Sequence, residues 1–240
     1  MFDRRKIQQD FSLAAPRYDA HADLQQQVLS ALIAKATPLL PPQAQVLDAG
    51  CGTGRLARQL QGHSIMQMDI AHAMCRQAAG PGAPAVCGAV EALPFQEGAF
   101  DAVFSSLVLQ WVPDAQAALA EMRRVLKPGG VLAVSTFGTG TLKELRESFT
   151  AVDSHAHVSA FHPPAEFAAA QTVTEYYPNL FALMRHLKSI GAGNKMLARR
   201  KSLMTRAEMQ RVERHYEERF KTKSGLPVTW EILYLVTRKI

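Results

Sequence analysis

A glycine-rich segment between two regular elements constrains this chain more than any other feature. Residues 48–54 read Asp-Ala-Gly-Cys-Gly-Thr-Gly. The apolar run Gln45–Ala49 predicts a buried strand that leads into them, and the stretch Arg55–Gln61 predicts a helix that follows. Glycines at alternate positions permit unusual φ angles and let the backbone approach a ligand closely, while a helix N-terminus favours polar or anionic groups. The chain is therefore expected to contain a strand–loop–helix unit that presents its backbone to a bound molecule.

Strand-like and helix-like stretches continue to alternate after this loop. The predicted strands are Ile65–Asp69, Ala85–Cys87, Ala102–Ser105 and Val131–Thr136, and the predicted helices between them are Ala71–Ala78 and Asp114–Leu126. This alternation is typical of βαβ units and predicts an α/β, Rossmann-like fold with a mostly parallel sheet. Residues 127–130, Lys-Pro-Gly-Gly, predict a sharp turn into the strand at Val131. The last segment, Val228–Ile240, predicts a strand joined antiparallel at the sheet edge.

Further elements flank this core. They are a helix at Leu24–Lys35, a helix at Thr141–Val152, a short helix ending at Ala170, a strand at Thr172–Tyr177, and helices at Leu180–Ile190 and Arg206–Phe220. A length of 240 residues suits one domain. We divide it into an N-terminal helical cap (1–40), a cofactor-binding core (41–137) and a C-terminal part with substrate or cap helices and edge strands (138–240).

Composition excludes several classes of protein. A hydrophobic fraction of 48% with 20% charged residues is ordinary for a globular chain and unlike a disordered or fibrous one. No apolar run approaches the roughly 18 residues that cross a bilayer, so no membrane partner is expected. The chain has 3 cysteines, too few for a disulfide framework or a Cys-rich zinc site, and this favours a cytoplasmic location. His155 and His157 lack a complete ligand set, so no metal is expected.

An acidic residue after the next strand indicates what the glycine loop binds. Asp69 ends that strand 15 residues beyond Gly54, where a carboxylate is placed to accept hydrogen bonds from ribose hydroxyls. The glycine spacing is G-x-G-x-G rather than the G-x-G-x-x-G of dinucleotide sites. Asp48, inside the strand, would repel a pyrophosphate but would suit a cofactor that carries a cationic amino-acid group. The sequence therefore predicts a nucleoside cofactor of that kind.

Three more stretches carry a resemblance to a known family. They are Glu91–Phe95 followed by Phe100 and Asp101, Val103–Val112, and Arg124–Gly130. With the glycine loop, they resemble the class I S-adenosylmethionine-dependent methyltransferases. The resemblance implies S-adenosylmethionine as cofactor and a mostly parallel sheet of seven strands with an antiparallel edge and a helical cap.

The resemblance also implies roles for individual residues. Asp48, Gly50, Cys51 and Gly52 would line the methionine end of the cofactor, with Gly54 in the same loop; Asp69 and Ile70 would hold ribose and adenine; Val90 and Glu91 would lie against the base; and Ser105 and Ser106 would face the sulfonium. Many members have an acidic residue at the position of Ala89, which would bond the adenine amino group. The methyl side chain of Ala89 cannot make that contact.

The flanks resemble the malonyl-acyl-carrier-protein O-methyltransferases. The stretches in question are Phe11–Asp19, His21–Gln27, Gln110–Trp111, Phe137–Leu145, Phe161–Pro164 and Met184–Asn194. The resemblance implies methyl transfer to the free carboxylate of malonyl-acyl carrier protein, the step that starts pimelate assembly for biotin. Tyr18 would close over the methyl donor, or else it only packs in the core. The alternatives are a small-molecule O- or C-methyltransferase of the same fold, and a protein that binds S-adenosylmethionine without turnover.

A carboxylate acceptor changes what the site must supply. It is ionised at neutral pH and needs no general base, so positioning and desolvation would carry the reaction. A cation would anchor it, and Arg185 or Lys188, on one helix face at i and i+3, is the candidate, with Arg146 next. The alternative is that these two cations are merely a solvated surface.

Positive charge is concentrated near the C-terminus. The whole chain carries +6, but residues 183–223 hold 12 Lys and Arg against 4 Asp and Glu, a local charge of +8. This segment, which includes Arg199, Arg200 and Lys201, would steer and dock an acidic acyl carrier protein; the alternative is a solvated helix face. A nucleic-acid partner is not expected, because the segment lacks the interleaved aromatic residues of single-strand binders and any helix-turn-helix or zinc signature.

Overall fold

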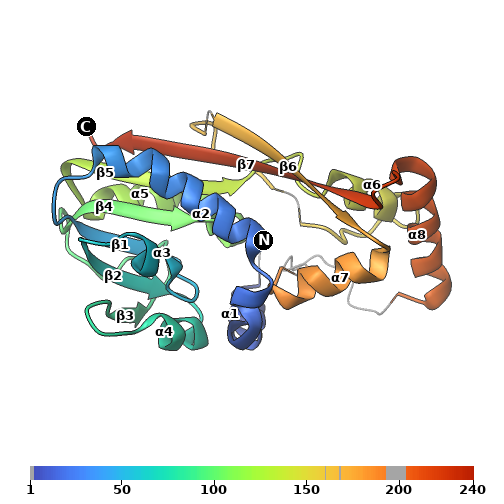
Figure 1. Ribbon diagram of the computed structural model, residues 1–240, viewed down its shortest axis with the longest axis horizontal. Helices are drawn as coiled ribbons and strands as arrows, with labels where there is room; N and C mark the ends of the chain where they lie inside the picture. Colours follow the sequence, from blue (N-terminus) through green and yellow to red (C-terminus); the bar gives the residue numbers. More distant parts are fainter. Residues whose placement is uncertain (1–2, 160, 168, 193–203) are drawn as a thin grey trace.

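A central sheet of seven strands organises the chain (Figure 1). The computed structural model describes residues 3–159, 161–167, 169–192 and 204–240. The strands run in the order β3-β2-β1-β4-β5-β7-β6. Two antiparallel strands thus extend a parallel sheet of five, which confirms the predicted fold class.

The five parallel strands alternate with helices along the chain. The strands are β1 (Gln45–Ala49), β2 (Ser64–Asp69), β3 (Ala85–Cys87), β4 (Phe100–Ser106) and β5 (Leu126–Phe137), and the helices are α3 (Arg55–Gln59), α4 (His72–Ala78) and α5 (Ala115–Val125). The predicted alternation is confirmed, with bounds that differ by a few residues. The Lys-Pro-Gly-Gly segment does not form a separate turn. It lies within β5, where the register against β4 shifts.

The strand order corrects one expectation. β7 (Leu226–Arg238) pairs antiparallel with both β5 and β6 (Ala169–Tyr177), so β6 and not β7 forms the edge. The reason is visible in the side chains of β7. Trp230 and Ile232 are buried on one face, while Leu233 and Leu235 pack into the core of the other. A strand covered on both faces belongs inside a sheet.

The prediction of a short helix that ends at Ala170 is also wrong. The chain makes a turn near Ala165, and β6 already begins at Ala169. Pairing with β7 takes up these residues, and tertiary pairing commonly overrides a weak local preference for helix.

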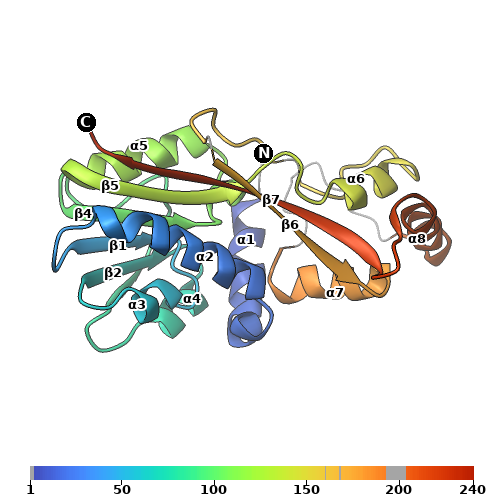
Figure 2. The same cartoon turned by 45° about the horizontal axis from the view of Figure 1, so that its top comes forward.

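The remaining helical segments lie either beyond the carboxyl ends of the parallel strands or, like the long N-terminal helix, over a face of the sheet (Figures 1 and 2). The N-terminal segments are α1 (Arg4–Ala14), η1 (Ala15–Ala20), α2 (Asp23–Ala36) and η2 (Thr37–Leu39); η3 (Leu109–Trp111) follows β4; and α6 (Lys143–Thr150), α7 (Leu180–Ser189) and α8 (Arg206–Phe220) come later. Within the described ranges, no helix is both long and apolar enough to span a membrane.

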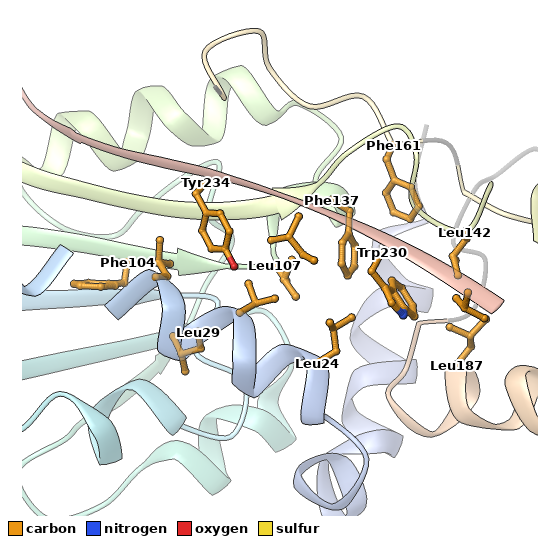
Figure 3. Close-up of a cluster of buried hydrophobic side chains, with 14 of the residues drawn as sticks. Leu24, Leu29, Phe104, Leu107, Phe137, Leu142, Phe161, Leu187, Trp230 and Tyr234 are labelled. Atoms are coloured by element: carbon orange, nitrogen blue, oxygen red, sulfur yellow. The ribbon is translucent and has the colours of Figure 1, made fainter. Parts of the chain in front are cut away.

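The hydrophobic core lies on both faces of the sheet. On one face, Leu24 and Leu29 of α2 pack toward Phe104, Trp230 and Tyr234 (Figure 3). On the other face, side chains of α5 pack against the strands. The sheet is therefore packed on both faces. The loops that follow the carboxyl ends of its parallel strands are the part of the fold that can form a binding site.

Candidate active site

The glycine loop is tied to the end of β2. The backbone N–H groups of Gly50 and Cys51 both donate to the Met68 carbonyl oxygen, at 2.7 and 2.9 Å, and the Gly52 N–H donates to Asp69 Oδ2 at 3.0 Å. Gly50, Gly52 and Gly54 have φ angles of +89°, +54° and +83°. These left-handed conformations explain why glycine stands at each position.

The three glycines nevertheless face different surroundings. A Cβ added to Gly50 would lie 2.2 Å from Val108 Cγ2, and one added to Gly54 would lie 2.9 Å from Ala78 Cα. A Cβ on Gly52 would meet no atom within 4 Å. Gly50 and Gly54 thus permit close packing inside the protein, whereas Gly52 leaves backbone open to a pocket that it lines.

Asp69 lines this pocket. Its carboxylate accepts hydrogen bonds from the backbone N–H groups of Gly52 and, at 2.8 Å, Ala71. Burial raises the pKa of Asp69, although these backbone hydrogen bonds oppose the shift. Ile70, Val90 and Glu91 line the same pocket. A carboxylate fixed in this way can accept further hydrogen bonds from hydroxyl groups.

Asp48 is a buried carboxylate without a partner. It is 4% exposed, and its side chain accepts no hydrogen bond from the described residues. Burial, together with the negative charge of Asp69, raises the pKa of Asp48 to about 8. A buried carboxylate in this state is stabilised by an added cation. This chemistry fits a cofactor that carries an ammonium group, as S-adenosylmethionine does.

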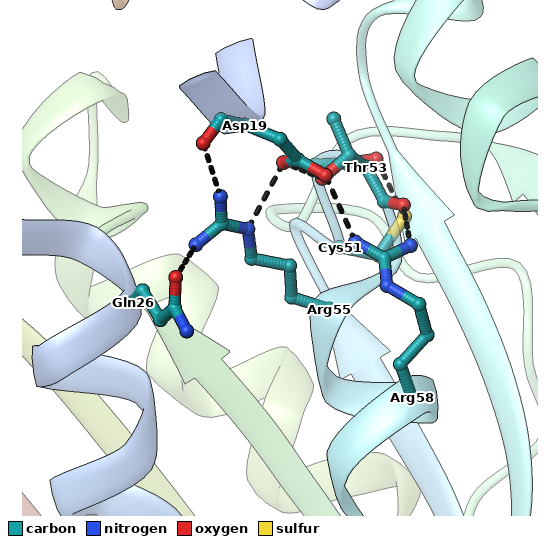
Figure 4. A network of polar contacts seen from close by, with 7 residues as sticks. Asp19, Gln26, Cys51, Thr53, Arg55 and Arg58 are labelled. Carbon is teal, nitrogen blue, oxygen red and sulfur yellow. Dashed lines mark hydrogen bonds and ion pairs between the residues drawn. The ribbon is translucent and has the colours of Figure 1, made fainter. Parts of the chain in front are cut away.

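The cap is held against the loop by a network around Asp19 (Figure 4). Asp19 Oδ1 accepts from Thr53 Oγ1 at 2.6 Å and from Arg55 Nε at 2.9 Å, and Oδ2 accepts from Arg58 Nη2 at 3.1 Å. Burial alone would raise the pKa of Asp19, but these hydrogen bonds lower it overall. The next residue back, Tyr18, lines the pocket, and burial raises its phenol pKa. The network therefore fixes an uncharged aromatic side chain over the glycine loop.

The first helix also covers the pocket. Arg4 pairs with Glu91 at 2.8 Å, and Gln8 Nε2 donates to the Ile70 carbonyl oxygen at 3.3 Å. Phe11 packs edge-on against Trp111, with ring centroids 5.8 Å apart. Side chains from α1 thus cover the pocket, which Arg4 and Phe11 also line.

A strained turn follows β4. Leu107 has φ +55°, which is unusual for a residue with a side chain. Its N–H donates to the Ser135 carbonyl oxygen, and its own carbonyl oxygen accepts from Gln110 Nε2 at 2.6 Å. Gln110 Oε1 in turn accepts from Thr136 Oγ1 at 3.2 Å. Because Val108 of this turn rests on Gly50, the turn and the glycine loop form one packed unit.

The predicted cofactor residues divide into two groups. Those that line the pocket are Tyr18, Gly50, Gly52, Asp69, Ile70, Val90, Glu91 and Ser106. Asp48, Cys51, Gly54 and Ser105 lie outside its lining. Ser105 is buried and donates to the Ala49 carbonyl oxygen at 2.7 Å, so its hydroxyl joins two strands.

A second, larger cavity lies beside the cofactor pocket. Its volume is about 1230 Å³, and its walls come from α1, α6, α7, residues 157–159 and Phe161. Most of the lining side chains are apolar, and Trp111 lines both the cavity and the pocket. The cavity and the pocket therefore adjoin at Trp111.

Several cations line this cavity. Arg185 and Lys188 do so from α7, and both side chains are exposed. The Arg185 guanidinium carbon lies 5.0 Å from the ring centre of Phe181. Arg146 does not line the cavity, because it donates to the carbonyl oxygens of Thr139 and Thr141. Arg199, Arg200 and Lys201 lie outside the described residues.

Sequence reasoning missed an acid–histidine pair in the cavity wall. His157 Nε2 lies 2.8 and 2.9 Å from the two carboxylate oxygens of Asp153. Burial raises the pKa of Asp153, but hydrogen bonds from His157 and the His155 backbone outweigh it and bring the pKa to about 2. The signal that the sequence offered for this pair was the spacing of Asp153 and His157, which are four residues apart. In the described ranges, no group of three or more His, Cys, Asp or Glu side chains could hold a metal ion.

Comparisons with known proteins agree with this geometry. A family model described as "Methyltransferase domain" matches residues 47–134. The structure resembles that of the YcgJ protein of Bacillus subtilis, with a TM-score of 0.61 at 15% identity over 89% of this chain and 98% of that one. Likeness at this identity supports the fold alone.

Two curated relatives identify the family more closely. The malonyl-[acyl-carrier protein] O-methyltransferase of Dechloromonas aromatica is 37% identical over 98% of this chain and 95% of that protein. The biotin biosynthesis bifunctional protein BioHC of Cellvibrio japonicus is 35% identical over 99% of this chain and 50% of that protein. The chain therefore belongs to the malonyl-[acyl-carrier protein] O-methyltransferase family, within the class I methyltransferases.

Proposed function

We propose that this enzyme transfers a methyl group from S-adenosylmethionine to the free carboxylate of a malonyl group carried as a thioester on acyl carrier protein. The product would be the malonyl methyl ester that starts pimelate assembly for biotin, in the cytoplasm. The observation that supports this most directly is that Trp111 lines both the pocket that holds Asp69 and Gly52 and a cavity of about 1230 Å³, which is large enough for a long acyl arm.

The residues around the pocket suit the cofactor. Asp69 would accept hydrogen bonds from the ribose hydroxyls, and the open backbone at Gly52 would allow close approach. Asp48, buried and unpartnered, would balance the ammonium group. When bound, S-adenosylmethionine supplies a methyl group on a positively charged sulfur. Tyr18 and Phe11 would keep water away from that end of the pocket.

The acceptor requires little acid–base chemistry from the protein. A carboxylate is ionised well below neutral pH, so the chain has to orient it and exclude water. Arg185 remains our candidate for the anchor, because its guanidinium lines the cavity and can bind a carboxylate with two parallel hydrogen bonds. Lys188, on the same face of α7, is the second candidate.

The carrier protein would dock on the basic segment of residues 183–223, with its local charge of +8. In its described part, Arg206, Arg211 and Arg214 of α8 are exposed. An array of this kind attracts an acidic partner at long range and increases the rate of association.

The pair formed by Asp153 and His157 favours a second candidate function. A histidine oriented by a carboxylate is the usual arrangement of a general base. It would suit a small molecule that must lose a proton from a hydroxyl group or a carbon atom before methylation. A carboxylate acceptor needs no such base, so the two functions differ in their dependence on His157.

One assay separates these functions. The protein is incubated with methyl-labelled S-adenosylmethionine and malonyl-acyl carrier protein, and a base-labile methyl ester is expected. His157→Gln should retain the carboxyl methyltransferase activity, with a pH profile like that of the wild type. Labelling of a phenol but not of the malonyl thioester would refute the proposal, and cofactor binding without any turnover would refute enzyme activity on both classes.

A further inference from the structure

Two large apolar side chains are exposed at the mouth of the cavity. Leu13, near the end of α1, is 80% exposed, and Phe181, near the start of α7, is 69% exposed. Both line the cavity, and a side chain that lines a cavity but is mostly open to solvent lies at its mouth. Of the four large hydrophobic side chains that are exposed in the described ranges, two therefore share one opening. Apolar side chains gathered in this way indicate a surface that a partner covers.

The α7 side of the mouth is a single stripe along the helix. Phe181, Arg185 and Lys188 are spaced at i, i+4 and i+7, which places them on one face of the helix. All three are exposed and line the cavity. Leu183, on the opposite face, is fully buried and holds the helix to the body of the protein. The stripe is therefore free to contact another molecule.

The α1 side of the mouth carries a matching stripe. Lys6, Asp10, Leu13 and Arg17 follow one another at helical spacing where α1 continues into η1, and all four line the cavity. Lys6 Nζ pairs with Asp10 Oδ2 at 2.9 Å. Arg17 is exposed and makes no ion pair with a described residue. At the mouth, this wall thus presents an apolar side chain and, one turn later, a cation.

The charge at the mouth has one sign. Among the described residues that line the cavity, Asp10 is the only acid, and it is already paired with Lys6. Arg17, Arg185 and Lys188 make no ion pair within the described ranges, so three positive charges surround the apolar side chains. A surface of this composition is complementary to a partner whose acidic groups surround an apolar patch.

The two walls are fixed relative to each other. Figures 1 and 2 show α1 and α7 side by side, and Gly191, just after α7, packs directly on α1. A Cβ added to Gly191 would lie 3.0 Å from Phe11 Cδ1 and 3.4 Å from the Asp10 carbonyl oxygen. The two stripes are therefore in place before a partner arrives, which lowers the entropy cost of binding.

We propose that Leu13, Arg17 and Phe181, which we call the rim, form the surface on which the folded body of the acyl carrier protein docks. The inference rests on the proposed function, in which the acyl arm enters the cavity while it stays covalently attached to the carrier. The carrier surface around the attachment point must then face the mouth. The basic segment of residues 183–223 would attract the carrier at long range, and the rim, with two members outside that segment or at its margin, would make the contact.

An anionic membrane is the other surface that apolar and cationic side chains can contact. A helix that lies in a membrane interface buries a broad apolar face. The other exposed side chains of α1 are charged or polar, namely Arg4, Arg5, Gln8 and Gln9. The rim offers apolar contact only beside the mouth, which favours a protein partner whose arm enters there.

The test measures binding of the carrier without the chemistry. The ligand is the holo form of a bacterial acyl carrier protein, which has the arm but no malonyl group, and its Kd is measured by calorimetry at about 0.05 and 0.5 M salt with S-adenosylhomocysteine present. Leu13→Ser should raise the Kd about tenfold at both salt concentrations, because an apolar contact is not screened. Phe181→Ser should act similarly. Arg17→Gln should raise the Kd about three- to fivefold at low salt and less at high salt.

Two matched variants control for surface changes elsewhere. Tyr176→Ser removes another exposed aromatic side chain, on β6 and outside the cavity lining. Arg5→Gln removes an exposed cation of α1 that does not line the cavity. Both should bind the carrier like the wild type, and all variants should keep the wild-type affinity for S-adenosylhomocysteine, which shows that the cap is folded.

Three results would overturn the inference. The first is an unchanged Kd in the Leu13, Phe181 and Arg17 variants. The second is an equal loss in Tyr176→Ser and Leu13→Ser. The third is binding of the wild type to phosphatidylglycerol vesicles that Leu13→Ser abolishes, with no binding of the carrier, because the rim would then contact a membrane.

The readout is binding, so it is separable from turnover. Methyl transfer to malonyl-acyl carrier protein without rim-dependent binding would refute this inference and leave the proposed function intact. Rim-dependent binding of the holo carrier without methyl transfer would support the docking surface and refute the proposed function.

Discussion

Replacing Gln110 with leucine tests whether the turn after β4 is held in place for the cofactor. Gln110 is 8% exposed and bridges two groups, the Leu107 carbonyl oxygen at 2.6 Å and Thr136 Oγ1 at 3.2 Å. The bridged carbonyl belongs to a residue with φ +55°. Left-handed backbone at a residue with a side chain is sustained only where its surroundings hold it.

The expected loss of stability can be worked out from the groups that lose their hydrogen-bond partner. Gln110→Leu leaves one buried carbonyl and one buried hydroxyl unpaired, at about 1–3 kcal/mol each. The leucine side chain offsets part of this through apolar burial, about 1–2 kcal/mol. These figures together span about 0–5 kcal/mol, and we expect the free energy of unfolding in urea to fall by the middle of that range, about 2–3 kcal/mol.

The effect on the cofactor is the more specific result. Val108 rests on Gly50, so a relaxed turn moves both away from the geometry that the loop requires. The Kd for S-adenosylmethionine, measured by calorimetry below the unfolding range, should rise about tenfold, which corresponds to about 1.4 kcal/mol. Asp114→Ala serves as a control of stability alone, because it removes the side-chain cap of α5 outside the cofactor pocket.

Two results would contradict this reasoning. A Gln110→Leu protein that is destabilised but keeps its affinity within twofold would show that the turn is structural only. A protein of unchanged stability would show that the two hydrogen bonds contribute little. Thr136→Val removes one bond of the pair, so its effect and that of Gln110→Leu should sum to more than the effect of the double variant.

Four further predictions concern the two ligands. Asp69→Ala should weaken S-adenosylmethionine binding by about 1–3 kcal/mol in calorimetry, because the ribose hydroxyls lose a charged acceptor; unchanged affinity would contradict the assignment. The raised pKa of Asp48, about 8, means that the free protein holds a proton which the cationic cofactor displaces, so affinity should rise from pH 6.5 to 8.5 and Asp48→Asn should abolish this slope. Arg185→Ala should lower kcat/KM for malonyl-acyl carrier protein by roughly 10–100-fold with little change in cofactor affinity, and Arg185→Lys should recover only part of the loss; full activity would place the anchor elsewhere. Charge reversal at Arg211 and Arg214 should raise KM for the carrier substrate at low salt but not for malonyl-pantetheine, and equal losses on both would indicate a structural role.

The sequence predicted those elements whose signals are local. β1 and α8 have the predicted bounds, because an apolar run before glycines defines β1, and a capping box between Thr205 and Glu208 starts α8. The glycine loop could be placed for the same reason, since it follows β1 directly.

The missed features depend on contacts between distant segments. Asp19 meets Arg55 across 36 residues, and Thr136 meets Gln110 across 26. No local pattern predicts such a partner. The position of β7 inside the sheet likewise depends on β6, which covers its far side. Sequence reasoning therefore located the cofactor loop but could not supply the side chains that support it.

The largely apolar surroundings of the site would favour a carboxylate as the group that accepts the methyl. The nucleophile would arrive already charged, and its reactivity would increase as water is removed from it. Phe11, Tyr18 and Trp111 line the cofactor pocket that would receive the methyl donor, and apolar side chains form most of the neighbouring cavity. Asp153 occupies the Nε2 atom of His157, so only Nδ1 is left to accept a proton, and a carboxylate acceptor has no proton to give. Exclusion of water and alignment by fixed contacts would then carry catalysis, so changes that admit water at Trp111 should lower kcat without adding a new ionisation to the pH profile.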